Sequence, residues 1–76
     1  MKMNSEEALV AFSDNYAPTG TDVPWVKSLD EIKNLVIDCT GVKVEINELR
    51  IYLEAHGYKK DISGEGILFY LYRATN

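Results

Sequence analysis

The chain has 76 residues and a formal net charge of -4 at pH 7, with 46% hydrophobic and 26% charged residues. This composition is too apolar for a disordered chain, and the length is sufficient for one small hydrophobic core. We therefore expect a single folded domain over residues 1–76. The acidic balance argues against a protein that holds nucleic acid through many phosphate contacts.

We expect neither an export signal nor a membrane span. Its apolar runs are far shorter than the ~20 residues that cross a bilayer, and its first residues lack the hydrophobic stretch of a signal peptide. Cys39 is the single cysteine, so an intramolecular disulfide is impossible. A cytoplasmic protein without a membrane partner is the expectation that fits best.

The first predicted helix covers about residues 5 to 16. Asn4 or Ser5 can cap its N-terminus, and its apolar side chains recur at helical spacing, at Leu9, Phe12 and Tyr16. Prolines and glycine then interrupt the chain up to Pro24 and predict a loop. A short edge strand is expected at its end, formed by Val23, Trp25 and Val26.

The second predicted helix covers residues 29 to 40. Ser28 and Glu31 have the spacing of a capping box, and Gly41 can adopt the left-handed conformation that ends a helix. One stripe of the helix is apolar and consists of Ile32, Leu35, Val36 and Cys39. The stripe predicts that Cys39 is buried as a small hydrophobic side chain.

The next segment, residues 42 to 46, alternates as a strand does but is short enough to be a turn between two helices, and we leave both interpretations open. A third helix is predicted over residues 47 to 56, capped by Asn47. Gly57 would end it, and Tyr58 would fold back onto its last turn.

A β-hairpin is predicted at the C-terminus, near residues 58 to 73. Its strands would cover Tyr58 to Ile62 and Ile67 to Arg73, and Ser63-Gly64-Glu65-Gly66 would form the turn. Because Gly64-Glu65-Gly66 joins two apparent strands, it is interpreted as a hairpin turn and not as a phosphate-binding loop. The predicted fold class is α+β, with three helices and a C-terminal hairpin.

This order of elements resembles the winged helix-turn-helix superfamily over residues 23 to 74. The segment from Asn47 to Lys60, followed by the hairpin, also looks like the small winged-helix segment that closes many phage and plasmid primase-helicases. The resemblance implies that the third helix enters the major groove and that the hairpin touches the DNA backbone. A phage or other mobile element is the implied source.

The resemblance also implies which residues would contact DNA. Base edges would be contacted by Asn47 and Arg50, together with Tyr52 and Glu54, and phosphates by Lys59, Lys60 and Arg73. The sequence departs from the usual pattern because acidic residues outnumber basic ones on or beside the third helix: Glu45, Glu48 and Glu54 against Lys43 and Arg50.

An acidic stripe and an aromatic strand suggest a protein partner instead. Asp30, Asn34 and Asp38 line one face of the second helix and, with Glu31, Glu45 and Glu48, could imitate nucleic-acid phosphates. Alternation in the last strand puts Tyr70 and Tyr72 on one face, where Trp25 is a candidate third member of an exposed aromatic surface. The alternative is that the first helix covers this face.

Catalysis is not expected. Cys39 is the single cysteine and His56 the single histidine of the sequence. No sequence feature indicates that they form the nucleophile–base pair that a cysteine enzyme needs. No clustered metal ligands and no cofactor motif are present, because Asp30, Asn34 and Asp38 form only a helix-face stripe.

The expected function is therefore a non-enzymatic binding module. The first hypothesis is a nucleic-acid-associated regulator or accessory factor. The second is an acidic inhibitor or adaptor that binds a host protein, and the third is a structural subunit whose second sheet face is buried by self-association. The oligomeric state stays open.

Overall fold

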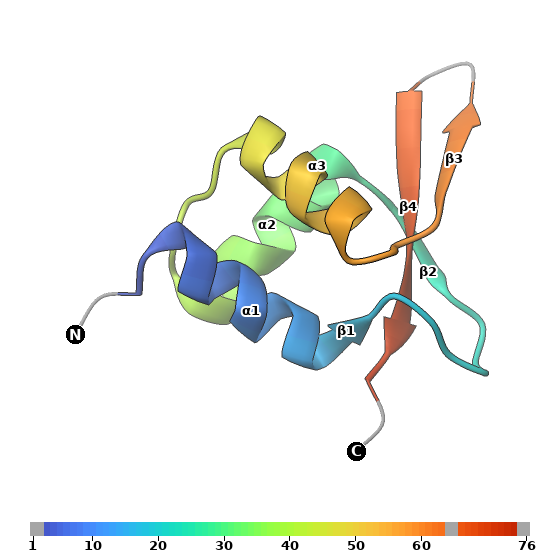
Figure 1. Ribbon diagram of the computed structural model, residues 1–76, viewed down its shortest axis with the longest axis horizontal. Helices are drawn as coiled ribbons and strands as arrows, with labels where there is room; N and C mark the ends of the chain where they lie inside the picture. Colours follow the sequence, from blue (N-terminus) through green and yellow to red (C-terminus); the bar gives the residue numbers. More distant parts are fainter. Residues whose placement is uncertain (1–2, 64–65, 75–76) are drawn as a thin grey trace.

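The computed structural model describes residues 3–63 and 66–74, and in this part the chain is α+β, as predicted. Three helices gather beside one sheet (Figure 1). The elements in chain order are α1 (Ser5–Asn15), β1 (Tyr16–Ala17), β2 (Trp25–Ser28), α2 (Leu29–Thr40), α3 (Ile46–Ala55), β3 (Lys60–Ser63) and β4 (Gly66–Arg73). The predicted helices and strands are confirmed to within one or two residues, and β1 was not expected.

The sheet is antiparallel and is built around β4. β2 pairs with one edge of β4 from Trp25↔Leu71 to Ser28↔Leu68. The other edge of β4 is shared, because β3 pairs with its first half through Lys60↔Phe69 and β1 pairs with its end through Tyr16↔Arg73. The predicted hairpin is thus confirmed by β3 and β4. Its turn residues Gly64 and Glu65 lie outside the described residues.

Two of the three predicted N-terminal caps form. Asn4 caps α1 in a capping box with Glu7. At α2 the Ser28 hydroxyl accepts from the Glu31 amide at 3.3 Å, and the Glu31 carboxylate accepts from the Ser28 amide at 3.0 Å. These reciprocal bonds satisfy helix amides that would otherwise lack partners, which fixes where each helix begins.

The helix ends also follow the glycine signals. Gly41 ends α2 with a φ of 74°, and Gly57 follows α3 with a φ of 79°, a conformation that favours glycine. The Tyr58 amide donates to the Leu53 carbonyl at 3.1 Å, so the chain turns back onto the last turn of α3, as predicted.

The start of α3 differs from the prediction. The helix begins at Ile46, and Glu45 is its N-cap without a side-chain bond, so the prediction that Asn47 caps the helix is wrong. Asn47 lies instead in the first turn. Residues 42–45 form the connection between α2 and α3 and contain no strand. The physical reason is the burial of Val44, which is 1% exposed and ties this connection to the core.

One hydrophobic core joins the helices to the inner face of the sheet. Each helix and β4 contribute to it, and the buried residues are Ala8, Leu9, Phe12, Ile32, Val36, Val44, Leu49, Leu53, Tyr58, Phe69 and Leu71. No helix among residues 3–63 and 66–74 is long and apolar enough to span a bilayer.

Tyr58 joins the two halves of the chain at the edge of this core. Its ring packs near Phe12, and its hydroxyl donates to the backbone carbonyl of Tyr16, where α1 becomes β1. Burial, with a smaller contribution from Tyr52, raises the pKa of Tyr58 from 10.0 to about 12. The folded state therefore favours the neutral phenol.

Cys39 does not lie in the core, and the prediction that it is buried is wrong. Ile32 and Val36 of the same stripe are buried, but Cys39 is exposed. Its angular position on α2 is correct for the stripe. The other elements leave this position of α2 uncovered, so the apolar pattern continues to a side chain that is not packed.

We expect Cys39→Ser to change the free energy of unfolding by less than about 0.5 kcal/mol, because an exposed side chain loses little packing on substitution. Urea unfolding measures this change. Val36→Ala on the same stripe is the buried control and should cost about 1 to 3 kcal/mol. A loss of similar size at Cys39 would show that its side chain is buried after all.

The raised pKa of Tyr58 predicts alkaline destabilisation. Because the folded pKa of about 12 lies above the unfolded value of 10.0, the contribution of Tyr58 is fully present below pH 10 and is lost as pH rises toward 12. Tyr58→Phe should be less stable than the wild type at neutral pH by about 1 to 2 kcal/mol, since the hydroxyl bond is lost. The difference should shrink across this pH range. A difference that stays constant with pH would contradict the assignment.

Candidate nucleic-acid interface

The outward face of α3 carries Asn47 and Arg50, which were predicted to contact base edges. Leu49 and Leu53 face the core, which leaves Asn47 and Ile51 exposed and Arg50 partly exposed on the other side of the helix. Ile51 is 59% exposed, so an apolar side chain lies at the centre of this polar face. The face is therefore a mixed surface that can make both polar and apolar contacts.

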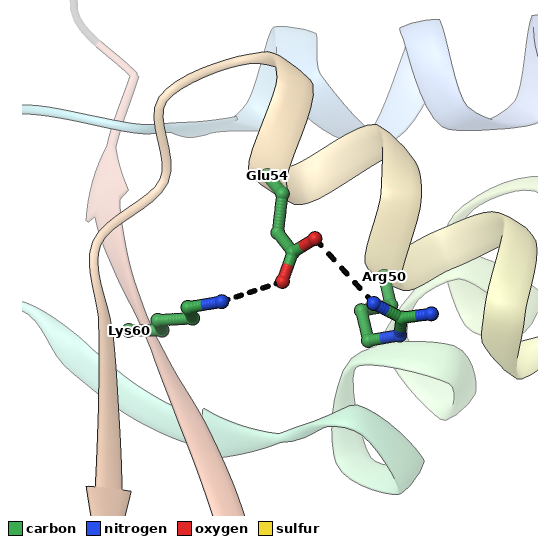
Figure 2. Close-up of polar contacts among 3 residues, drawn as sticks. All are labelled: Arg50, Glu54 and Lys60. Carbon is green, nitrogen blue, oxygen red and sulfur yellow. Dashed lines mark hydrogen bonds and ion pairs between the residues drawn. The ribbon is translucent and has the colours of Figure 1, made fainter.

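Three charged side chains meet beside this face and form an ion-pair cluster of Arg50, Glu54 and Lys60. The Lys60 Nζ lies 2.6 Å from one oxygen of the Glu54 carboxylate, and an Arg50 guanidinium nitrogen lies 3.5 Å from the other. Figure 2 shows Glu54 between the two cations, with Arg50 on the same helix and Lys60 on the neighbouring strand. Arg50 and Lys60, both predicted to contact nucleic acid, thus lie on either side of the Glu54 carboxylate.

The cluster is held at the surface. Its side chains are 38%, 33% and 41% exposed for Arg50, Glu54 and Lys60. The hydrogen bond from Lys60, and then the positive charges of Lys60 and Arg50, lower the pKa of the Glu54 carboxyl. The carboxylate is therefore ionised at neutral pH, and the cluster as a whole carries one net positive charge.

Glu48, by contrast, is directed away from the outward face of α3. The Ser5 hydroxyl donates to its carboxylate at 2.7 Å, and one helical turn later the Tyr52 hydroxyl donates to Ser13 at 3.0 Å. These two bonds tie α3 to α1. Glu48 therefore contributes less negative charge to the outward face than its sequence position suggested.

The other predicted phosphate contacts are Lys59 and Arg73. Lys59 is exposed next to Lys60, and Lys43, a further exposed cation, lies in the connection that precedes α3. Arg73 lies at the far end of β4, opposite Tyr16 and four residues beyond the partner of Lys60, which is roughly 13 Å along the strand. Arg73 thus does not join the cluster.

The acidic stripe of α2 is exposed, as its spacing predicted. Asp30, Asn34 and Asp38 are all at the surface. Glu31, which was grouped with them, is engaged in the cap of α2. The hydrogen bond from the Ser28 backbone, with a further one from its side chain, lowers the pKa of Glu31. Two members of the larger acidic surface, Glu31 and Glu48, thus have structural partners.

The aromatic residues do not form one surface. Trp25 is opposite Leu71 and shares its face of the sheet, whereas Val26 is opposite Tyr70, so Trp25 and Tyr70 lie on opposite faces. The grouping of Trp25 with Tyr70 and Tyr72 is therefore wrong, and the register is the reason. Trp25 is 46% exposed and packs edge-on against Tyr16, with ring centroids 5.6 Å apart.

The face of Tyr70 and Tyr72 is covered in part, though not by α1. α1 packs its buried residues into the core with Phe69 and Leu71, on the opposite face. The loop before β2 lies against Tyr72 instead, because a Cβ added at Gly20 would be 2.8 Å from the Tyr72 Cβ. Tyr70 and Tyr72 are accordingly half-buried, and Val26 beside Tyr70 is 45% exposed.

The residues considered for catalysis are not brought together as a site. Cys39 is at the exposed end of α2, and His56 stacks on Tyr52 after α3, with ring centroids 4.0 Å apart. No group of three or more His, Cys, Asp or Glu side chains in the described part of the chain is arranged to hold a metal ion.

The role of Glu54 was only partly visible in the sequence. Arg50 and Glu54 are four residues apart, a spacing that pairs side chains on a helix, so this contact could have been predicted. The contact with Lys60 requires the chain to turn at Gly57 and return beside α3. The bond from Ser5 to Glu48 joins residues 43 apart and has no local signal.

Comparisons with known proteins assign no family to the chain: no protein-family model matches it, and neither a curated protein nor a solved structure is significantly similar. The geometry of the described residues therefore carries the functional argument.

The close approach of Gly20 to Tyr72 yields a stability prediction. Gly20→Ala should lower the free energy of unfolding by about 1 to 3 kcal/mol, because the added methyl group would force the loop away from the sheet. Thr21→Ala, at an exposed neighbouring position, should have an effect below about 0.5 kcal/mol. Chemical denaturation of both variants compares them. Equal stability would mean that the loop does not pack on this face.

Proposed function

We propose that this chain is a winged-helix module that binds nucleic acid and has no catalytic activity of its own. The order strand, helix, short connection, helix and hairpin, with β4 between β2 and β3, supports the winged-helix interpretation. In this arrangement α3 would be the helix that enters the major groove. The single observation that carries the proposal is the convergence of Arg50 and Lys60, from α3 and β3, on one exposed surface.

The distribution of charge supports the same surface. Residues 43–61 contain four basic and four acidic side chains, so the whole net charge of -4 comes from the rest of the chain. Within that segment Glu48 is bonded to Ser5 on α1. The segment that contains α3 and β3 is therefore neutral overall, whereas the chain before it is acidic, so a polyanion would be repelled less at α3 and β3 than at the N-terminal part of the protein.

The proposed roles follow the positions of the side chains. Asn47 and Arg50, on the outward face of α3, would contact base edges, and the exposed Ile51 beside Asn47 would make apolar contacts there. Lys59 and Lys60 would contact phosphates. Arg73 belongs to the opposite end of β4 and is left out of this interface.

A second candidate function is an acidic inhibitor or adaptor that binds a host protein, for example by imitating nucleic acid. The exposure of the whole α2 stripe, Asp30, Asn34 and Asp38, favours it, as does the exposed Val26 next to Tyr70. Such a protein would bind its partner without any need for Arg50 or Lys60.

The test is binding of a short, fluorescently labelled DNA duplex of mixed sequence, followed by anisotropy over a series of salt concentrations. Lys60→Gln should weaken binding about three- to tenfold and should reduce the slope of log K against log salt by about 1, because one phosphate contact is lost. Arg50→Gln should weaken binding similarly.

Arg73→Gln is the matched control, since it removes one positive charge at the other end of β4. It should have the smaller effect. Equal losses for Lys60→Gln and Arg73→Gln would indicate attraction by overall charge without a defined interface. No salt-dependent binding by the wild type would contradict the proposal and favour the protein-binding alternative.

A further inference from the structure

Glu54 occupies the two cations that the proposed interface would use. One carboxylate oxygen bonds to Lys60 at 2.6 Å, and the other faces Arg50 at 3.5 Å (Figure 2). A carboxylate held between a lysine and an arginine has the charge and the two acceptor oxygens that a phosphate group would present at this position.

From this geometry we infer that Glu54 is an internal competitor for the phosphate backbone and limits the affinity of the nucleic-acid interface. The inference rests on the proposed function and concerns how that same site is regulated. A bound phosphate and Glu54 would need the same donors of Lys60. Binding therefore requires that the ion pair open or that the cations be shared between two anions.

Three properties make this competition effective. The Lys60 hydrogen bond lowers the pKa of Glu54, so the carboxylate remains charged at neutral pH and keeps competing. All three side chains are at the surface, where ion pairs are weak and exchange partners readily. Among the described residues, the Glu54 side chain bonds to Arg50 and Lys60 and to no core residue, so its role is not explained by packing.

A positioning role is the opposing explanation. Glu54 could hold Lys60 and Arg50 in the arrangement that a phosphate needs, in which case its removal would weaken binding. The two explanations predict opposite signs for the same substitution. Glu54→Gln is suited to decide between them, because it removes the charge, keeps the shape of the side chain and alters only an exposed ion pair.

The experiment measures binding of the same mixed-sequence duplex by wild type, Glu54→Gln and Asp38→Asn. Asp38 is the control, since its loss changes the net charge equally, from the exposed stripe of α2. The C-terminal end of α2 and β3 lie on opposite sides of the molecule in Figure 1. Glu54→Gln should tighten binding about fivefold and steepen the salt slope by about 1, whereas Asp38→Asn should change affinity less than about twofold.

A second comparison tests whether Glu54 acts through Lys60. In a Lys60→Gln background, the gain from Glu54→Gln should fall to less than about twofold, because the main contested cation is absent. Unfolding of each variant in urea checks that all are folded, and little change is expected for an exposed ion pair.

The outcomes separate the inference from the proposed function. Salt-dependent binding by the wild type with no gain, or with a loss, in Glu54→Gln would overturn the inference and leave the interface in place. A gain equal to that of Asp38→Asn would also overturn it, since only net charge would matter. If no variant binds the duplex, the proposed function fails and the inference fails with it.

Discussion

Pairing with β4 is the constraint on which the rest of the structure depends. Every other strand of the described sheet pairs with β4, which receives β2 along one edge and both β3 and β1 along the other. Its inward residues Phe69 and Leu71 are fully buried and carry the core on which the helices pack. Because β3 is held in register by β4, Lys60 is presented at a defined place beside the end of α3, where it meets Glu54.

The same register separates the two faces of the sheet and assigns each a different environment. Residues that alternate along a strand point to opposite faces, so the pairing of Trp25 with Leu71 removes Trp25 from the face of Tyr70. The helices cover only the face of Phe69 and Leu71. The other face is left to the loop at Gly20, which explains why its tyrosines are neither fully exposed nor fully buried.

Local signals were sufficient to predict most of the elements. The capping box at Ser28, the glycines Gly41 and Gly57 and the return of Tyr58 each depend on neighbouring residues, and each formed as predicted. The errors concern tertiary context: α3 begins at Ile46 because Val44 is buried, and Cys39 is exposed because no other element covers its position on α2. No spacing rule could reveal either, since burial is decided by elements distant in the sequence.

In the candidate site, too, the contact between Arg50 and Glu54 follows from local spacing, whereas the contacts of Lys60 and Ser5 depend on the fold. These contacts change how the charge of the chain is interpreted. Counted along the sequence, acids outnumber bases beside α3, which argued against contact with a polyanion. In the folded chain Glu48 accepts a hydrogen bond from Ser5, and Glu54 lies between two cations. Two of these carboxylates therefore already have partners within the protein. The field at a surface is set by which charges already have partners and by how firmly they hold them. The net charge of -4 therefore sets the long-range repulsion between this protein and a polyanion. At contact distance, the interaction would depend on the ion-pair cluster of Arg50, Glu54 and Lys60.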